Sequence, residues 1–405
     1  MSIRQQTVLE RLRVKNFRSL VDVDLSFDRL IVLVGANGSG KSTVIDVVRF
    51  VRDALTRSLD DAILDRSGIA SIRRWSPGGA PDVTIQLWLR GANWDAEYSF
   101  VIGSEQRGAW RVKAENLRIT QTPSDRVGEY VIEQPTLEFH VKEGKLDHAL
   151  EGLGHIAERL PTLISTNTLL MPQLRLLSFM RAPDEMYRFF ADMSFHTIYP
   201  NSLREPQKPG NDYPLDERGQ NLASVLRSLQ QNHDSYALLN DALGRVVEGV
   251  RSYTVRPIGG FLVTRLQHTA MEGGRRGPAF DLSQESDGTL RMLGILTALY
   301  QEPARSILTI EEPELTIHPG ALGVLCDVIL EASARSQVIV TTHSPDLIDR
   351  FPTNSLRVVD KHDGVTSVGP VSDDQRDVIA RHLFSPGELL RIEGLQREDT
   401  RKGSR

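Results

Sequence analysis

The chain has few of the features that mark disulfide-rich, membrane-spanning or generally basic proteins. Its 405 residues include one cysteine, Cys326, which excludes an internal disulfide and a cysteine-based zinc site, and which we interpret as a buried packing residue. No apolar run approaches the ~20 residues that a membrane helix requires. The N-terminal segment 1–13 is too polar for a signal peptide. We therefore expect a cytoplasmic protein.

The sequence also lacks an excess of positive charge. Its 48 lysine and arginine residues face 53 aspartate and glutamate residues, a formal net charge of -5. A surface for nucleic acid would therefore have to be a local patch. The length predicts two or three domain-sized units.

The segment Gly35–Ser42, Gly-Ala-Asn-Gly-Ser-Gly-Lys-Ser, follows the apolar run Leu30–Val34 and precedes a segment with helical apolar spacing. A strand that ends in such a loop and opens a helix directs several backbone N–H groups at one anion. We therefore predict a phosphate-binding loop, rather than a chance glycine-rich turn, and expect Lys41 to reach the outer phosphates of a nucleotide. The predicted nucleotide contacts are Gly35, Asn37, Gly38, Ser39, Gly40, Lys41, Ser42 and Thr43, with Ser42 also binding Mg²⁺.

Alternating apolar residues predict an antiparallel arrangement around this loop, within residues 1–145. Residues 8–27 read as a hairpin that turns near 16–19. The expected strands of a meander are Val83–Leu89, Ala96–Ile102, Trp110–Thr120, Tyr130–Ile132 and Leu137–Val141.

From Leu146 the apolar period becomes helical and predicts a compact helical insert lobe over residues 146–250. Its apolar positions include Leu160, Leu163, Leu169, Leu174, Leu177 and Phe189. The proline-rich stretch 199–214 predicts a surface loop or hinge. No sustained heptads occur, so a long coiled-coil arm is not expected.

Residues 251–379 begin with two strand-like segments and then alternate helices with strands, before a charged tail at 380–405. The segments 306–312 and 338–343 predict buried strands that end in polar residues. This alternation favours an α/β fold with a parallel core sheet and a ligand at the carboxyl edge of that sheet.

Two adjacent acids, Glu311 and Glu312, end the first of these strands. Glu311 would hold Mg²⁺, and Glu312 would be the general base that orients and deprotonates the attacking water. The alternative is a strand that simply ends in a charged turn. Adjacent acids at the end of a buried strand are costly without a cation, which favours the catalytic interpretation.

His343 follows the next strand, in the segment Thr-Thr-His-Ser-Pro. At that position it could sense the transferred γ-phosphate and help to hold the water. By itself such a residue is more often a hydrogen-bonded core histidine. Its place after the strand that follows the acids favours the catalytic role.

A second predicted anion-binding element is Ser286–Thr289, at the start of a helix, with Ser286, Asp287, Gly288 and Thr289 as candidate nucleotide contacts. One nucleotide cannot use both this element and the phosphate loop of the same subunit if they lie on different faces. We therefore expect a head-to-tail homodimer in which each subunit's Ser286 and Gly288 cap the partner's ATP. The alternative is a plain helix cap by Ser286 or Asp287.

The order of these motifs resembles the ABC-type ATPases of the SMC, RecF and OLD branch, in particular stand-alone bacterial AAA-family ATPases that are related to OLD but lack its nuclease domain. Val14–Leu20 is similar to the opening strand of that branch, and Asp287–Arg291 to its variant signature. The resemblance implies a P-loop NTPase with an ABC-type head, an N-terminal antiparallel β subdomain, and ATP and Mg²⁺ as ligands. Because few residues follow His343 in this sequence, we expect no nuclease domain of the OLD type.

Three positions depart from the family pattern. Glu311 stands where most ABC ATPases have aspartate, and the usual glutamine after the first meander strand has no secure counterpart, because Gln86 lies within a predicted strand. His318 and Pro319 stand where transporters place the aspartate loop that contacts the partner subunit, which predicts a different contact across the interface.

The leading functional hypothesis is an ATP-gated dimer that hydrolyses ATP and regulates a separately encoded effector, a nuclease or a toxin-like protein. The resemblance implies a role in DNA maintenance or phage defence. The alternative is a nucleotide-switched DNA-binding clamp in DNA repair with little turnover, and nucleic acid is thus a candidate partner. A transporter subunit is disfavoured by the signature and the missing glutamine.

The clamp hypothesis depends on a local basic and aromatic patch. The residues that would supply phosphate contacts and base stacking are Lys15, Arg18, Arg73, Arg74 and Trp75. A solvated loop, or a contact of the two adjacent arginines with the nucleotide, would explain the same residues.

Overall fold

The computed structural model describes residues 7–76, 79, 81–105, 108–121, 126–127, 130–131, 137–149, 165–175, 181–270 and 277–398. The chain divides into two compact units. The first unit comprises Met1–Asp28, Ala36–Met193 and Val359–Gly369, and the second unit comprises Arg29–Gly35, Ser194–Val358 and Pro370–Arg405. No helix among the described residues is both long and apolar enough to cross a membrane.

An antiparallel sheet forms the centre of the first unit. Its neighbouring strands are, in order, β10 (Lys145–Ala149), β9 (Leu137–Lys142), β6 (Trp110–Gln121), β5 (Trp94–Ser104), β4 (Val83–Arg90), β1 (Val8–Phe17) and β2 (Leu20–Ser26). In β2 and β4, for example, alternate residues are buried, which gives these strands one apolar face. The predicted hairpin and most of the predicted meander are confirmed.

Two predictions in this region were wrong: the place of one strand in the meander, and the start of the helical insert. The predicted strand Tyr130–Ile132 is not part of the meander, because β8 (Tyr130–Val131) pairs with β7 (Arg126–Val127) in a separate two-stranded ribbon. Ile132 lies outside the described residues. Leu146, where the helical insert was expected to begin, lies in β10 and pairs with Val141.

The helices of the first unit come after the start of the phosphate loop (Gly35–Ser42) in the chain. They are α1 (Lys41–Thr56), α2 (Leu59–Leu64), α3 (Ile69–Ile72), α4 (Met171–Leu174) and α5 (Arg181–Ala191). The apolar face of α1 is buried as its spacing predicts. α5 packs on α1, and Tyr187 Oη donates a hydrogen bond to Thr56 O at 3.3 Å.

A parallel sheet forms the centre of the second unit, in the order β17 (Leu356–His362), β3 (Leu30–Val34), β16 (Gln337–Thr342), β15 (Ile307–Glu311) and β11 (Ser194–His196). Val34 pairs with Thr342, and Thr341 pairs with Glu311. The carboxyl ends of β3, β16 and β15 therefore meet at one edge of the sheet, as the predicted topology required. These three strands are buried along their whole length except at Glu311, which is what strands covered on both faces show.

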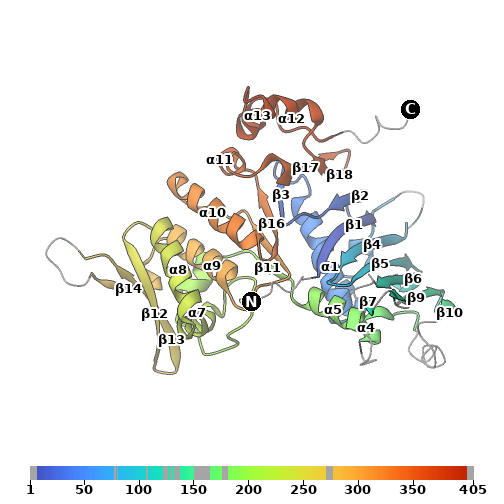
Figure 1. Cartoon of the computed structure of the whole chain (residues 1–405), viewed down its shortest axis with the longest axis horizontal. Helices are drawn as coiled ribbons and strands as arrows, with labels where there is room; N and C mark the ends of the chain where they lie inside the picture. Colours follow the sequence, from blue (N-terminus) through green and yellow to red (C-terminus); the bar gives the residue numbers. More distant parts are fainter. Residues whose placement is uncertain are drawn as a thin grey trace. The chain divides into compact units, whose positions relative to one another are not determined.

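Helices and a small sheet surround these strands in the second unit. The helices are α6 (Pro200–Arg204), α7 (Leu222–Gln231), α8 (His233–Val246), α9 (Asp287–Tyr300), α10 (Leu322–Ser333), α11 (Pro345–Ile348), α12 (Asp373–Ala380) and α13 (Pro386–Ile392). The small sheet contains β12 (Val250–Ile258), β13 (Phe261–His268) and β14 (Ala279–Asp281). Helices α8, α9 and α10 lie side by side (Figure 1) and share one apolar core with β3, β15 and β16.

The predicted insert lobe, residues 146–250, is not a separate unit. Its residues up to Met193 belong to the first unit, and from Ser194 onward they belong to the second. Helices α7 and α8 contribute to the apolar core of the second unit, because Leu226 and Leu243 pack in the same cluster as Leu308 and Val340. Leu160, Leu163 and Leu177 lie outside the described residues, and the predicted tail 380–405 contains α13.

Candidate nucleotide site

The phosphate loop leaves the carboxyl end of β3 and enters α1 at Lys41. Gly38 and Gly40 have φ angles of +78° and +111°, in the left-handed region that glycine adopts without strain. Gly40 is also crowded, because a Cβ atom there would lie 2.3 Å from Thr366 Oγ1. Both glycines thus have a geometric reason to be present.

Thr366, on β18 (Val365–Pro370), supports this loop from outside the motif. Its Oγ1 lies 2.9 Å from Ser39 O and 2.9 Å from Ser19 Oγ, and its side chain is buried. A hydroxyl has one proton and Ser39 O can only accept, so Thr366 donates to Ser39 O and accepts from Ser19. Sequence reasoning missed this residue, since no local pattern relates a late strand to the loop.

The polar groups of the loop fit a bound phosphate. Lys41 is 7% exposed, and its Nζ donates to Ala36 O at 3.1 Å. Ser39 Oγ is buried without a hydrogen-bond partner among the described residues. A buried hydroxyl and a buried ammonium beside a helix N-terminus are suited to an anion. Ser42, the second residue of α1, is exposed.

The two acids occupy the carboxyl edge of the parallel sheet in the second unit. Glu311 ends β15, and its Oε1 accepts a hydrogen bond from Thr197 Oγ1 at 3.3 Å. Glu312 has a φ of +44°, which is uncommon for a residue other than glycine. Its N–H lies 3.0 Å from Thr341 O and 3.1 Å from Thr341 Oγ1, so the neighbouring strand holds this conformation.

His343 follows β16 at the same edge. Its Nδ1 lies 3.5 Å from Glu312 Oε1 and 3.8 Å from Glu314 Oε1. The imidazole is 42% exposed, so His343 is not a core histidine. Thr342 Oγ1 donates to Glu314 Oε1 at 2.6 Å, and His343 N donates to the same oxygen at 3.3 Å. Glu314, which was not among the predicted site residues, therefore holds the backbone that carries His343.

Arg291, on α9, is the third residue that sequence reasoning did not place in the site. Its Nη2 donates to Glu312 O at 2.9 Å and to Glu311 O at 3.3 Å, and its Nη1 donates to Ile198 O at 3.0 Å. Burial lowers the pKa of its guanidinium, and the nearby carboxylates of Glu314 and Glu312 oppose that shift.

Ser286–Thr289, the signature turn, opens α9. Ser286 is the N-cap, as the alternative interpretation expected, and its Oγ accepts from Thr289 N at 3.2 Å. Asp287 forms an ion pair with Arg204. The backbone N–H groups of Asp287 and Gly288 have no acceptor among the described residues, so capping leaves donors of the first turn available.

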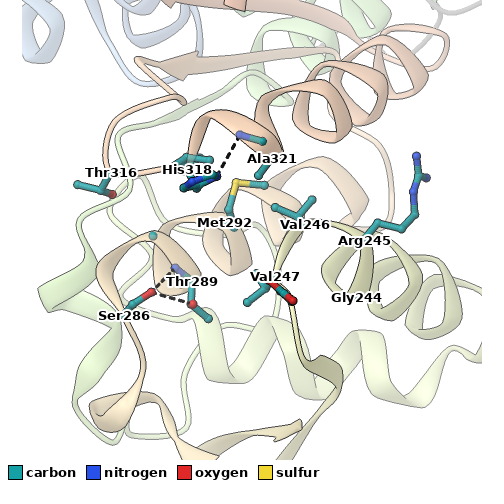
Figure 2. A pocket seen from close by; sticks show the side chains of 14 residues that line it. Gly244, Arg245, Val246, Val247, Ser286, Thr289, Met292, Thr316, His318 and Ala321 are labelled. Carbon is teal, nitrogen blue, oxygen red and sulfur yellow. Dashed lines mark hydrogen bonds between the residues drawn. The ribbon is translucent and has the colours of Figure 1, made fainter. Parts of the chain in front are cut away.

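A pocket of about 530 Å³ lies beside the signature turn (Figure 2). Ser286, Gly288 and Thr289 line one side, and the segment after β15, with Thr316 and His318, lines another. The two sides are in close contact, because a Cβ atom at Gly288 would lie 2.6 Å from Thr316 O. The signature turn is thus accessible in the single chain.

The second unit brings together the start of the phosphate loop at Gly35, both acids and His343, while the loop from Ala36 onward belongs to the first unit. Among the described residues, no group of three or more His, Cys, Asp or Glu side chains could hold a metal ion. Mg²⁺ at phosphate sites usually takes one or two protein oxygens and several from phosphates and water. The predicted donors, the Ser42 hydroxyl and the Glu311 carboxylate, are each oxygen ligands of the kind that Mg²⁺ takes.

Two family models match the chain. One is described as an AAA domain, putative AbiEii toxin, type IV TA system, and matches residues 173–349. The other is described as an AAA ATPase domain and matches residues 8–72. The two matches include the acids and the phosphate loop, respectively.

Among curated proteins, the OLD nuclease of Thermus scotoductus is 24% identical over 396 residues, which are 94% of this chain and 68% of that protein. The DNA double-strand break repair Rad50 ATPase of Thermoplasma volcanium is 42% identical over 59 residues, 14% of this chain and 7% of that protein. Among solved structures, the SMC head bound to the C-winged helix domain of ScpA has a TM-score of 0.50 at 15% identity, covering 91% of this chain and 99% of that chain. These findings confirm the predicted α/β P-loop ATPase fold and the resemblance to ABC-type ATPases of the SMC and OLD type.

Proposed function

We propose that this ABC-type, SMC- and OLD-like ATPase binds ATP with Mg²⁺ and hydrolyses it as a head-to-tail homodimer, whose closure regulates a separately encoded effector. The observation that carries the proposal is the shared carboxyl edge of β3, β15 and β16, where Gly35, Glu312 and His343 follow three neighbouring parallel strands. Ligands of parallel sheets bind at that edge.

In this proposal the phosphate loop and Lys41 hold the phosphates, and Ser42 and Glu311 hold Mg²⁺. Glu312 takes a proton from the attacking water. The oxygen of that water bonds to the γ-phosphorus while the bond between the γ-phosphorus and the bridging oxygen that leaves with ADP breaks. His343, 3.5 Å from Glu312, helps to hold that water and senses the γ-phosphate. Glu314 and Arg291 fix the backbone of these two residues.

The accessible signature turn supports the proposed homodimer. In the ATP-bound dimer, Ser286 and Gly288 of one subunit approach the nucleotide of the partner, with the uncapped N–H groups of α9 directed at its γ-phosphate. Because ATP is then part of the interface, its hydrolysis opens the dimer.

The family matches support a role in nucleic-acid processing. One relative is named a nuclease, one a DNA double-strand break repair ATPase, and one family model a putative toxin. We therefore favour a nuclease or toxin-like effector, in phage defence or DNA maintenance.

The deciding variant is Glu312→Gln, which keeps the shape of the side chain but cannot accept the proton. Hydrolysis should fall by about 10²–10⁴-fold, and the variant should accumulate in ATP as a dimer of the 45.3 kDa chain, measured by light scattering after gel filtration. Lys41→Ala is the control, because loss of the phosphate-binding ammonium should abolish binding of a fluorescent ATP analogue. The same mass with and without ATP would contradict the dimer, and unchanged affinity of Lys41→Ala would contradict the phosphate loop.

A second candidate function, binding of DNA, is favoured by one surface of the first unit. Trp75 is 82% exposed, and Arg73 and Arg74 form no ion pair with a described residue. The loop is anchored, since Arg74 N donates to Asn16 O at 2.8 Å. An exposed indole beside arginines that pair with no described acid suits base stacking and phosphate contact.

The patch is smaller than the sequence indicated. Lys15 and Arg18 form ion pairs with Asp22 at 3.5 Å and Asp46 at 2.8 Å, so part of their charge is neutralised. DNA binding should weaken in Arg73→Ala/Arg74→Ala and lose up to about two units of its logarithmic salt slope.

The matched control for the DNA test is Arg57→Ala/Arg90→Ala. It removes two exposed arginines of the same unit that already pair with Asp65 and Asp95. If duplex DNA binds equally well to both double variants at low salt, the patch has no role in DNA binding.

A further inference from the structure

Arg291 connects the signature turn with the acids in the same subunit. It lies three residues after Gly288 on α9, so the two positions share one side of the helix. Its side chain is 6% exposed and reaches Glu311, Glu312 and the segment before α6. Helix α9 thus carries both the signature turn, offered to the partner's nucleotide, and Arg291, which bonds the backbone of Glu312, the general base of its own subunit.

Arg291 contacts the backbone of the acids and not their carboxylates, so it can fix the position of the chain that carries them. One guanidinium nitrogen bonds the successive carbonyls of Glu311 and Glu312. Both carbonyls can face it because Glu312, at a φ of +44°, leaves the extended conformation of β15. A backbone held in this region persists only where its surroundings support it. Arg291 on one side and Thr341 on the other supply that support.

The fixed fork of the guanidinium is the reason for an arginine here. Its donors are held in one plane and reach three carbonyls at once. A lysine would keep the charge, but its compact ammonium cannot span acceptors on both sides. A shift of α9 would therefore move the peptide that carries Glu312.

We propose that Arg291 is a positioning residue that holds Glu312 of its own subunit in the hydrolytic conformation and connects that base to the signature turn engaged with the partner's nucleotide. This rests on the proposed ATPase dimer. The base of one site then depends on engagement of the other site, so the two sites hydrolyse ATP cooperatively.

The first test is Arg291→Lys. We expect kcat to fall by at least about tenfold while KM changes less than about threefold, because a misplaced catalytic group costs rate rather than binding. The Hill coefficient for ATP should fall toward one from a wild-type value between one and two. In the Glu312→Gln background the substitution should leave the ATP-dependent dimer mass unchanged. Unaltered kcat and Hill coefficient would overturn the proposal.

Loss of a buried arginine could act through stability alone, and Arg305→Lys controls for this. Arg305 is 4% exposed in the same unit and bonds Tyr213 Oη at 2.5 Å, away from the acids. Its replacement should lower the melting temperature without the fall in kcat. A fall in kcat equal to that of Arg291→Lys would overturn a specific role for Arg291.

Two mixed dimers with the same pair of substitutions make the test independent of folding. In the first, one subunit carries Arg291→Lys and the other carries Glu312→Gln. The only intact Glu312 then lies in the subunit whose Arg291 is replaced. In the second, one subunit carries both substitutions and the other is wild type. The only intact Glu312 then lies in the subunit that keeps Arg291. The second should hydrolyse ATP at least about ten times faster than the first. Equal rates would overturn the inference, whereas failure of the wild type to dimerise or hydrolyse would refute the proposed function instead.

Discussion

Gly40→Ala tests the support that Thr366 gives to the phosphate loop. The new Cβ would lie 2.3 Å from Thr366 Oγ1 and 2.6 Å from its Cγ2, both shorter than any ordinary contact. Thr366 is buried and bonded to Ser39 and Ser19, so it cannot move away without losing those hydrogen bonds. The substitution should therefore distort the turn into α1.

Two costs add up at this position. The left-handed backbone, at a φ of +111°, costs an alanine about 1–2 kcal/mol. Overpacking against Thr366 costs about 1–3 kcal/mol. We expect Gly40→Ala to lower the free energy of unfolding by about 2–5 kcal/mol and to abolish binding of a fluorescent ATP analogue.

A double-mutant cycle separates these costs. Thr366→Ala alone should cost about 1–3 kcal/mol for its two hydrogen bonds. In Gly40→Ala the same change removes Oγ1 and Cγ2, the two closest atoms of the clash, and leaves Cβ at 3.0 Å. The two changes should therefore couple favourably by about 0.5–3 kcal/mol. Gly38→Ala is the matched control, because its φ is +78° and a Cβ atom there would meet no described atom within 4 Å. Gly38→Ala should lower the free energy of unfolding only by the cost of alanine in the left-handed region, and its effect should add to that of Thr366→Ala without coupling. Additive free energies of urea unfolding for Gly40→Ala and Thr366→Ala would refute this reasoning.

Two buried titratable groups should give pH dependences of opposite sign. Burial raises the pKa of Glu115 to about 7, so the stabilisation from the protonated carboxyl is present below pH 4.5 and is lost as the pH rises to 7. Glu115→Gln should remove this pH-dependent loss, which amounts to about 3 kcal/mol of unfolding free energy. A pH profile of stability parallel to that of the wild type would contradict this prediction. Burial lowers the pKa of His196 to about 4, so stability should be lost as the pH falls from 6.5 to 4, again by about 3 kcal/mol. His196→Leu should abolish that loss in chemical unfolding between these pH values, and persistence of the loss would show that other groups cause it.

Local sequence signals predicted the elements that carry the proposed chemistry. The phosphate loop could be read because its glycines, its lysine and the flanking strand and helix are contiguous. The strands that end at Val34, Glu311 and Thr342 were predicted from short, mainly apolar segments that lead into polar residues. These signals are local because each depends on the spacing of neighbouring residues.

The separate helical lobe over residues 146–250 was mispredicted, because the spacing of apolar residues shows that a segment is helical but not which core its apolar face joins. Helices α7 and α8 have the expected helical character, yet their apolar faces complete the core of the second unit. The short strand β11 escaped detection because three residues show no measurable alternation.

The sequence by itself determined the phosphate loop, the pair Glu311 and Glu312, and the strand–helix order that places His343 beside them. Only the tertiary structure decided that Thr366 supports the loop, that Glu314 holds His343, and that Arg291 holds the backbone of Glu312. The physical reason is that these three contacts join side chains to backbone atoms of other elements. Such contacts depend on how strands pair and helices pack, and they leave no periodic trace in the sequence.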